Sequence, residues 1–407
     1  MKKGITFLLC LACAFTITGI SNQNTATNIR VQAQNTMDMR QEITVATKQA
    51  ETLAIKGKSA YLMDYHSQTP IFTKNERERL PIASMCKIMT LLLTFEAIDN
   101  GALAIDEEIT VSERAASMGG SQVFLEANAK YRVKDLIKSI VVCSANDSCV
   151  ALAERIAGGE EIFTARMNEK AKQLGANDTL FANCTGLPKE PQYSCAKDVA
   201  VMLKALLSHD EYYEYGSVWM DKFAHPKGRY TEISNTNKLV RFYEGCDGGK
   251  TGFTNQAGFC LAATAKRNNM RIISVVIGEE SSANRFNDVR GMFDYAFANY
   301  CVTPVVESEQ VLEENAVVSA GKCQTVKGCP VRSSYVFTRR GEKADVRIET
   351  KYQSNLRAPI SKGDTIGEMI VYKDGIEIDK IPVIAAENVE FANFFDRLGD
   401  VARGWNG

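Results

Sequence analysis

Histidine is scarce in this chain, whose 407 residues include three: His66, His209 and His225. None belongs to a recognisable motif, so a Ser-His-Asp catalytic triad is disfavoured. Metal-binding patterns are missing as well. The only C-x-x-C pattern joins Cys10 and Cys13, and no Cys/His cluster has the spacing of a zinc site. We therefore expect neither a metal nor another cofactor.

An excess of either charge is also missing, because 48 Lys and Arg residues nearly balance 49 Asp and Glu residues, for a formal net charge of −1. This balance gives no electrostatic reason to expect a nucleic-acid partner. Glycine and proline occur at ordinary levels, and no internal repeat is visible. The hydrophobic fraction of 45% is enough for a sizeable core. The chain length suggests about two or three domains.

Residues 1–33 have the pattern of a secretory signal peptide. Lys2 and Lys3 form a basic start, Ile5–Ile20 is apolar, and Val31–Ala33 is a small-residue cleavage site. The alternative is an uncleaved membrane anchor, although an apolar stretch of about 16 residues is short for a span. We expect an exported protein that works outside the cytoplasm.

Cleavage of this signal would leave ten of the 12 cysteines. Export permits disulfides, and two pairs flank short loops, but spacing alone confirms neither Cys184–Cys195 nor Cys323–Cys329. Other cysteines fall in predicted helices, where we expect buried free thiols. These are Cys86, Cys143 and Cys149.

The stretch Pro81–Asn100 predicts a helix with one apolar stripe, followed by Gly101 as a C-cap. Ser84 lies near its first turn and Lys87 three residues later, so both point to one side. A hydroxyl beside an amine, at the positive end of a helix with an apolar face, can make a serine nucleophilic without histidine. The stripe comprises Ile88, Leu91, Leu92, Phe95 and Ile98.

Other segments predict strands, then helices, then strands, in that order along the chain. This order favours an α+β fold, or an α/β sandwich, with one antiparallel sheet. Strands are expected at 59–64, 70–74, 245–251, 258–265 and 271–277. Further helices are expected at 133–143, 147–157, 160–174, 195–207 and 282–300.

From Cys301 onward the pattern changes to short β-branched segments separated by turn residues. Asp374-Gly375 is a strong hairpin signal, and we predict a small all-β domain over 301–388. Residues 389–407 return to helical spacing, with aromatic residues on one face. Such an amphipathic helix suits contact with a membrane surface. Docking on its own protein is the alternative, because the polar face is not basic.

Three short motifs indicate the chemistry: Ser84-x-x-Lys87, Ser144-x-Asn146 and Lys250-Thr251-Gly252. The first two patterns recur by chance at Ser194–Lys197, Ser319–Lys322 and Ser282–Asn284. Order and context separate them from these copies. The first motif opens an apolar helix, the second interrupts two helices, and the third ends a predicted strand before a turn. This set is the signature of serine β-lactamases and penicillin-binding proteins.

The chain resembles one family in particular, the low-molecular-mass penicillin-binding proteins that are serine-type D-alanyl-D-alanine carboxypeptidases (peptidase S11). The resemblance covers roughly residues 59–389. It includes Phe181–Asn183 with Gly186-Leu187, Gln192–Ser194 with Asp198, Asp247–Gly249, and Ala358–Ile360 through Gly375. It implies a β-lactamase/transpeptidase-like catalytic domain over 34–300, followed by the β-domain and the terminal helix.

The resemblance also implies a role for each motif residue. Ser84 would attack the carbonyl between two terminal D-alanines, and Lys87 would accept its proton, which requires a lowered pKa from burial and from Lys250 nearby. Ser144 would relay a proton to the leaving amine, and Asn146 would bind the acyl side of the substrate.

The remaining implied residues would bind two negative groups, the oxyanion that forms in the reaction and the carboxylate of the substrate. The oxyanion would be held by the backbone N–H groups of Ser84 and Phe253. The substrate carboxylate would meet the Lys250-Thr251-Gly252 segment, with Arg285 as a further positive partner carried over by position. Phe253 departs from the polar residue common at this point. Cys86, between Ser84 and Lys87, suggests sensitivity to thiol reagents.

The predicted function is hydrolysis of the terminal D-Ala–D-Ala bond of peptidoglycan stem peptides, outside the cytoplasm at the outer face of the cytoplasmic membrane. β-Lactams would acylate the same serine, because their strained amide imitates that bond. A serine β-lactamase and a non-catalytic peptidoglycan-binding protein are the alternatives. Endopeptidase or transpeptidase activity also stays open, because an amine can intercept an acyl-enzyme.

Overall fold

The computed structural model describes residues 53–393. The predicted signal peptide, residues 34–52, and residues 394–407 of the predicted terminal helix lie outside the described residues. Within the described range, no helix combines the length and the apolar character that crossing a membrane would require.

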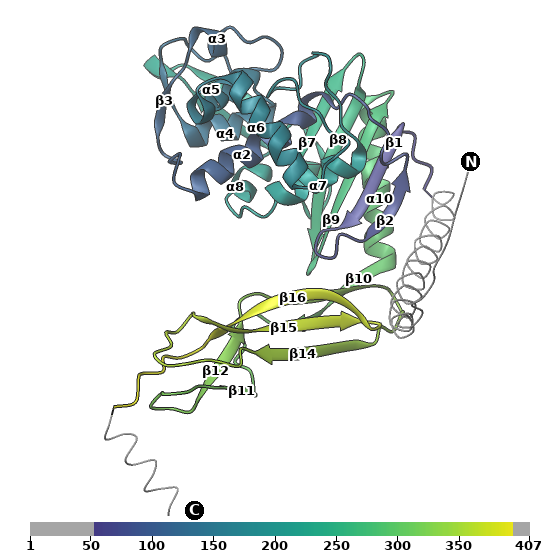
Figure 1. Ribbon diagram of the computed structural model, residues 1–407. Coiled ribbons are helices and arrows are strands. Elements are labelled where there is room, and N and C mark those ends of the chain that lie inside the picture. The colour runs from purple at the N-terminus through teal and green to yellow at the C-terminus, as the bar shows by residue number, and fades with distance from the viewer. Residues whose placement is uncertain (1–52, 394–407) are drawn as a thin grey trace, which may run out of the picture. The chain divides into compact units, whose positions relative to one another are not determined.

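The catalytic region is built on a five-stranded antiparallel sheet, in which the first two strands of the region join the last three (Figure 1). The strand order is β2-β1-β9-β8-β7, so β7 is an edge strand. This confirms the predicted antiparallel sheet. The strands are β1 (Ser59–Asp64), β2 (Pro70–Lys74), β7 (Cys246–Thr254), β8 (Gly258–Arg267) and β9 (Met270–Glu279).

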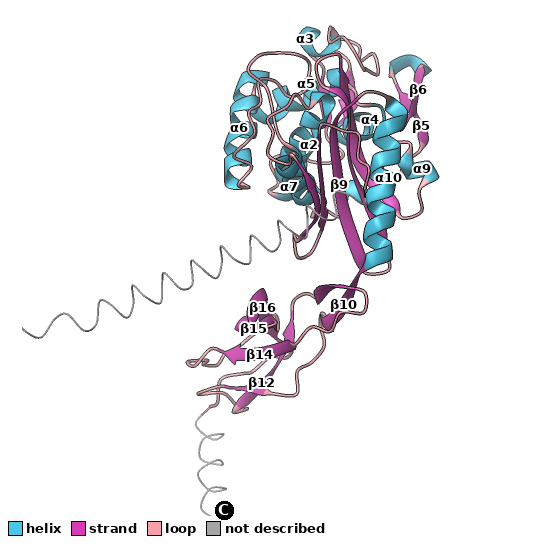
Figure 2. Cartoon of the chain, turned by 90° about the vertical axis from the view of Figure 1, so that its right-hand side faces the viewer, coloured by secondary structure: helices cyan, strands magenta, loops and turns pink. Residues whose placement is uncertain are grey.

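Helices cover both faces of this sheet (Figure 2). On one face α10 (Ser282–Asn299) packs against β8 and β9, and on the other α7 (Ala196–Leu206) packs against β1 and β9. Every residue of β9 is buried, as expected for a central strand covered on two sides. The helical layer on the α7 side also contains α2 (Lys87–Asp99), α4 (Val133–Cys143), α5 (Asn146–Ala157) and α6 (Glu160–Gln173).

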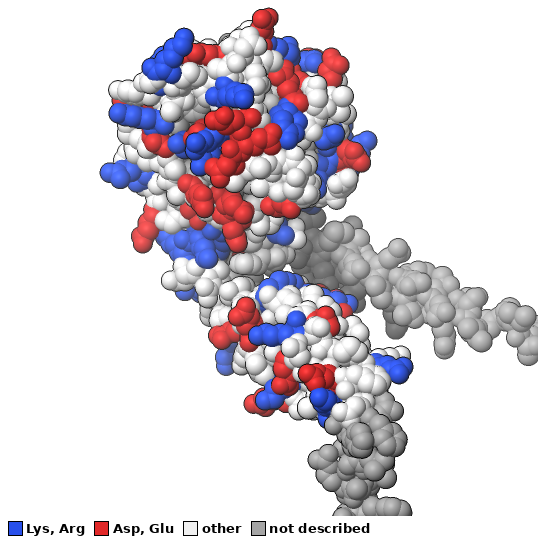
Figure 3. All heavy atoms as spheres, turned by 90° about the vertical axis from the view of Figure 1, so that its left-hand side faces the viewer, with Lys and Arg blue, Asp and Glu red and all other residues white. Residues whose placement is uncertain are grey.

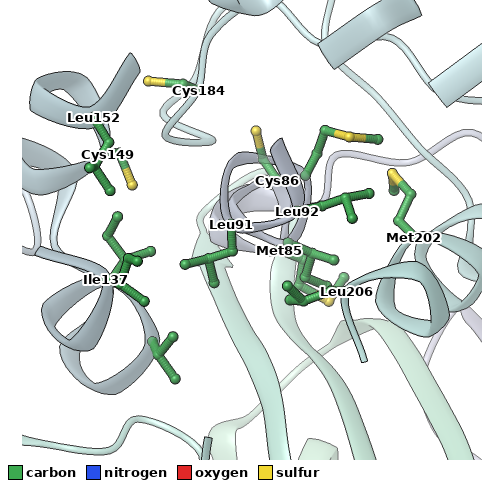
Figure 4. Close-up of a cluster of buried hydrophobic side chains, with 14 of the residues drawn as sticks. Met85, Cys86, Leu91, Leu92, Ile137, Cys149, Leu152, Cys184, Met202 and Leu206 are labelled. Atoms are coloured by element: carbon green, nitrogen blue, oxygen red, sulfur yellow. The ribbon is translucent and has the colours of Figure 1, made fainter. Parts of the chain in front are cut away.

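The helix α2 is the centre of the core. The sequence predicts one apolar stripe, yet nine of its residues are buried, including Lys87 and Thr90. Figure 4 shows the reason, because Ile137 of α4 lies on one side of α2 and Leu206 of α7 on the other. A helix enclosed on several sides needs small or apolar residues around its circumference, so its sequence carries a weak amphipathic signal.

Short elements connect these layers and complete the catalytic region. They are η1 (Ala83–Cys86), β3 (Glu108–Thr110), α3 (Glu113–Ala116), β4 (Lys130–Arg132), α8 (Tyr212–Gly216), β5 (Met220–Ala224), η2 (Pro226–Gly228), β6 (Tyr230–Ser234) and α9 (Leu239–Phe242). Figure 3 shows acidic and basic side chains interspersed over one face of the protein.

The rest of the described chain is all-β, as predicted, and has its own hydrophobic core. A five-stranded sheet has the order β11-β12-β16-β15-β14, and β10 pairs with β13. The hairpin predicted at Asp374-Gly375 joins β15 to β16. The strands are β10 (Tyr300–Val306), β11 (Asn315–Val317), β12 (Thr325–Pro330), β13 (Ser334–Arg339), β14 (Val346–Tyr352), β15 (Thr365–Lys373) and β16 (Ile376–Ala385).

Residues 389–393 differ from the prediction of a helix starting at residue 389. Val389 forms a bridge with Ile360, and Phe391 forms one with Gly321, so this segment is extended. Val389 is buried in the core of the β-domain. The hydrophobic residues here pair with a neighbouring backbone, an interaction that helical periodicity along the sequence does not reveal.

Candidate active site

Ser84 lies in η1, a short 3-10 turn that precedes α2. The sequence predicts one continuous helix here, but Ala83 has a left-handed φ of +47°, which an ordinary α-helix does not contain. The turn is closed by a hydrogen bond from Met85 N to Ile82 O of 3.1 Å. This sharp entry leaves Ser84 half-buried at the start of the helix rather than within it.

Lys87 contacts Ser84 directly, as the S-x-x-K spacing predicts. Its Nζ donates to Ser84 Oγ at 2.9 Å and to the backbone carbonyl of Thr185 at 2.7 Å. The side chain is fully buried, and this burial lowers the pKa of Lys87 from its ordinary 10.5. Desolvation disfavours the ammonium form, so the neutral amine becomes more accessible.

The loop that supplies Thr185 is held by Asn183. Its Oδ1 accepts from Gly186 N at 2.7 Å and from Thr185 N at 3.1 Å, so Asn183 supports the loop. Gly186 has φ +79°, and an added Cβ would lie 2.0 Å from Ala83 O. Only glycine therefore lets this loop pack against η1. The sequence gives no signal for the Thr185 carbonyl, because a backbone acceptor is independent of the residue type.

Ser144 and Asn146 lie where α4 ends and α5 begins. Ser144 is the C-cap of α4 in a left-handed conformation, with φ +66°. The Asn146 amide donates to Gly119 O at 2.7 Å, and its backbone N–H donates to Ser121 O at 2.7 Å. Within residues 53–393, buried Ser144 Oγ and Asn146 Oδ1 have no hydrogen-bond partner. Buried polar atoms are normally satisfied, so these two are available to a ligand.

The K-T-G motif lies on edge strand β7. Lys250 is buried, and its Nζ donates to Thr251 O at 3.2 Å. Burial, and then the positive charge of Lys87, hold the pKa of Lys250 well below its usual 10.5. Thr251 Oγ1 donates to Thr236 Oγ1 at 2.8 Å, a contact that the sequence did not indicate.

Gly252 brings β7 against η1. A Cβ added there would lie 2.6 Å from Ile82 O and 3.3 Å from Ser84 N. A larger residue would push the strand away from the serine, which explains the glycine of the motif in physical terms. Phe253 follows with 51% of its surface exposed, and its ring stacks on Phe259 at 4.3 Å.

Arg285, from the first turn of α10, also reaches β7. Its Nη1 donates to Gly252 O at 3.1 Å and to Cys260 O at 3.3 Å. Burial lowers the pKa of Arg285 from 12.5 to about 10. This arginine therefore adds positive charge beside the K-T-G motif, while these two carbonyls hold its guanidinium in place.

The first and third motifs meet where Gly252 packs against η1. Thr236, which bonds Thr251, also donates its backbone N–H to Val142 O at 3.0 Å, two residues before Ser144.

The chance copies are instead used structurally. Ser194 Oγ bonds Thr179 Oγ1 at 2.8 Å, and Ser319 Oγ donates to Leu356 O at 2.9 Å. Ser282 Oγ accepts from Arg285 at 3.3 Å. Each of these hydroxyls is already paired, unlike that of Ser144.

The expected sensitivity of Cys86 to thiol reagents is wrong for this structure. Cys86 is fully buried, its thiol donates to Asn183 O at 3.2 Å, and burial raises its pKa. A protonated, enclosed thiol reacts slowly. All ten cysteines within residues 53–393 are free, so neither candidate disulfide is formed.

Ser84 is hydrogen-bonded to a buried lysine, and a second buried lysine and unpaired polar atoms belong to the other motifs. This arrangement defines the class of protein as a serine-type hydrolase that works without histidine. Comparison with known proteins agrees. The sequence profile of D-alanyl-D-alanine carboxypeptidases (Peptidase_S11) matches residues 44–281. The profile of the C-terminal domain of penicillin-binding protein 5 matches residues 301–391.

The chain belongs to the D-alanyl-D-alanine carboxypeptidase family, peptidase S11, which confirms the family expected from the sequence. It is similar to the D-alanyl-D-alanine carboxypeptidase DacF of Bacillus subtilis (strain 168), with 39% identity over 359 residues, covering 88% of this chain and 92% of that protein. DacC of Escherichia coli (strain K12) is 32% identical over 363 residues, covering 87% and 90%.

Solved structures show the same relationship. Penicillin-binding protein 5 from Haemophilus influenzae aligns with a TM-score of 0.64 and 30% identity, covering 83% of this chain and 98% of that one. Penicillin-binding protein D2 from Listeria monocytogenes, in an ampicillin-bound form, aligns with a TM-score of 0.52 and 30% identity. This second alignment covers 60% of this chain and 99% of the other.

Proposed function

We propose that this protein hydrolyses the terminal D-Ala–D-Ala bond of peptidoglycan stem peptides through an acyl-enzyme on Ser84 and releases D-alanine. The observation that carries the proposal is the 2.9 Å contact between Lys87 Nζ and Ser84 Oγ. Lys87 is buried and its pKa is lowered, so a neutral amine can accept the serine proton.

Acylation follows from this contact. Ser84 Oγ bonds to the carbonyl carbon of the scissile amide while its proton passes to Lys87 Nζ. The backbone N–H groups of Ser84 and Phe253 stabilise the negative oxygen of the tetrahedral intermediate. The C–N bond then breaks, and Ser144 relays the proton from Lys87 to the departing nitrogen of D-alanine. Water attacks the resulting ester, which restores the Ser84 hydroxyl and frees the shortened peptide.

Recognition of a chain end requires a site for its carboxylate. Lys250 and Thr251 provide this site, and Arg285 adds positive charge next to them. Because β7 is the edge strand of the sheet, its outer backbone groups can pair with an extended peptide. Asn146 Oδ1 accepts from the acyl side of the substrate. Gly252 keeps this edge close to Ser84.

β-Lactams fit the same arrangement, because their amide lies next to a carboxylate as in acyl-D-Ala-D-Ala. The proposed organisation places the signal peptide at residues 1–33, the catalytic domain at 34–300, the β-domain at 301–393, since Val389 belongs to its core, and a membrane-contacting segment within 394–407. The basic start and apolar stretch of residues 1–33 support export. The aromatic residues of the C-terminal segment support peripheral contact with the outer face of the cytoplasmic membrane.

The test is release of free D-alanine from a peptide ending in D-Ala-D-Ala, with and without penicillin. We expect release that penicillin blocks, together with slow turnover of the penicillin itself. Rapid hydrolysis of penicillin would indicate a β-lactamase instead. Peptide binding without release of D-alanine would indicate a non-catalytic wall-binding protein.

A further inference from the structure

We propose that Thr90, a buried residue of α2, is a positioning residue for the reaction, because its hydroxyl holds the loop whose carbonyl directs Lys87 toward Ser84. This inference rests on the proposed function and adds to it a residue that lies in the core, away from the substrate. Thr90 has no exposed surface, and its Oγ1 donates to the backbone carbonyl of Cys184 at 2.6 Å. Cys184 directly precedes Thr185, whose carbonyl accepts from Lys87.

The carbonyls of residues 183–185 all accept hydrogen bonds from side chains at the start of α2. The donor–acceptor pairs are Cys86 Sγ to Asn183 O at 3.2 Å, Thr90 Oγ1 to Cys184 O at 2.6 Å, and Lys87 Nζ to Thr185 O at 2.7 Å. Figure 4 shows Cys86 at the start of α2 and Cys184 on this neighbouring loop. Lys87 and Thr90 lie three residues apart in a helix, so they share one face. A thiol is a weak donor, so the Thr90 hydroxyl makes the stronger of the two neutral contacts.

The N–H groups of the same loop are held from elsewhere. Asn183 Oδ1 accepts from the N–H groups of Thr185 and Gly186, and Glu160 Oε1 accepts from Cys184 N at 3.4 Å. The carbonyl direction is therefore left to the side chains that come from α2. Without the Thr90 hydroxyl, the buried carbonyl of Cys184 would lose its donor, which is costly. The loop would shift to satisfy this carbonyl and would carry the next one, Thr185 O, with it.

The position of Thr185 O matters because of the shape of a neutral amine. Lysine Nζ then has one lone pair, and only this lone pair can accept the serine proton. The contact with Thr185 O occupies an N–H of Lys87 at 2.7 Å, which leaves the lone pair free to face Ser84 Oγ at 2.9 Å. A displaced carbonyl would let Nζ turn away from this direction. Displacement of a reacting group by about 1 Å can cost on the order of 10²-fold in rate.

The ionisation of Lys87 gives a second, independent signature. Burial lowers the pKa of Lys87. A carbonyl that accepts from the ammonium favours the charged form, so a displaced Thr185 O should lower this pKa further. A substitution at residue 90 changes none of the titratable groups that act on Lys87. These groups are the thiols of Cys86, Cys143, Cys149 and Cys184 and the ammonium of Lys250.

The experiment replaces the Thr90 hydroxyl in a graded series. Thr90→Ser keeps the hydroxyl, Thr90→Cys offers a weaker donor, and Thr90→Val keeps the shape and offers no donor. For each variant, kcat/KM for D-alanine release is measured across pH, and urea unfolding verifies that the variant is folded. We expect kcat/KM to decrease in this order, by roughly 10- to 100-fold for Thr90→Val, and its rise with pH to move to lower pH.

Thr94→Val is the matched control. Thr94 is also fully buried on α2, but its hydroxyl donates to Thr90 O of the same helix at 2.8 Å. This control should keep the wild-type rate and pH profile. A wild-type rate in Thr90→Val, or a lower rate with an unmoved pH profile, would overturn the inference.

If Thr90→Val does not fold, the serine and cysteine variants decide the question. Equal kcat/KM for Thr90→Ser and Thr90→Cys would then overturn the inference, because donor strength at residue 90 would not affect the reaction. Failure of the proposed function is distinguishable, because the wild type itself would then release no D-alanine.

Discussion

Two charged groups on β7, three residues apart, are treated in opposite ways. Asp247 receives both arms of Arg271 at 2.7 Å, and Arg271 also donates to Thr264 at 3.0 Å. Lys250 is buried without a carboxylate partner in the described chain, and its hydrogen bond goes to a backbone carbonyl. The comparison teaches that β7 stabilises the fold with a paired charge and leaves a second charge unpaired, and we propose that the substrate carboxylate binds this second charge.

The largest effect is expected at the active site, beside the unpaired Lys250. Ser84→Ala should remove labelling by tagged penicillin and lower kcat/KM for D-alanine release on the order of 10³-fold or more. The cause is loss of the atom that forms the acyl bond. The matched control is Ser319→Ala, which alters another S-x-x-K serine and should keep full labelling. Equal labelling of wild type and Ser84→Ala would refute the nucleophile assignment.

Lys87→Arg should cost roughly 10²- to 10⁴-fold in kcat/KM, because a guanidinium cannot give up its proton to become a base. For the wild type, kcat/KM should rise with pH through the pKa of Lys87, which burial places below 10.5. A pH–rate profile of acylation checks both statements. An arginine variant with the wild-type rate would show that another group accepts the proton.

Breaking the ion pair between Asp247 and Arg271 should instead lower the stability of the fold. Arg271→Met leaves Asp247 without its partner, and we expect the free energy of unfolding to fall by about 2–3 kcal/mol, less than for a fully enclosed pair because Asp247 is partly exposed. Urea unfolding measures this change. Adding Asp247→Leu should recover part of the loss, since both charges are then gone. No recovery would mean that Arg271 acts mainly through its contact with the Tyr213 ring.

A third arrangement lies at the end of β9, where Glu279 is buried and faces Asp288. Burial, and then the neighbouring carboxyl of Asp288, raise the pKa of Glu279 from 4.5 to about 8. The folded state therefore holds a proton more tightly than the unfolded one. Its contribution to stability is complete below about pH 4.5 and is lost as pH rises through about 8.

In Glu279→Gln the free energy of unfolding should depend less on pH. Its change between pH 6 and pH 7 should be smaller than in the wild type by about 1 kcal/mol. Thermal or urea unfolding of wild type and variant at several pH values provides the measurement. The exposed Glu280→Gln serves as the neighbouring control and should follow the wild type. Parallel curves for wild type and Glu279→Gln would mean that Glu279 ionises normally.

Much of the fold was predictable because local signals were strong. The predicted boundaries of β1, β2 and α4 coincide with those observed, since each is a short apolar segment between clear turn residues. The sequence predicts where α2 lies, but it does not predict that α2 is buried on several sides. Helical spacing reports which residues are apolar and not how many neighbours surround the helix.

The site was predictable only as residue types in order. Nothing local indicates that Thr185 O would hold Lys87, that Thr236 would meet Thr251, or that Ala83 would adopt a left-handed turn. The first two are contacts between segments separated in the chain, and the first of them uses a backbone acceptor. The third is a backbone conformation that packing against β7 and the Gly186 loop imposes. They become visible only when the loop around Asn183 and strand β7 close on η1.

The sequence by itself determined the family, the three motifs, the long helices of the catalytic region and its antiparallel sheet. Only the tertiary structure decided that the buried Ser144 hydroxyl is left unpaired, that Cys86 is inaccessible, and that residues 389–393 are extended. The physical reason is that pairing, burial and the shift of a pKa depend on distances across the fold. A local pattern of side chains gives residue type and spacing along the chain, whereas only packing sets the distances across the fold.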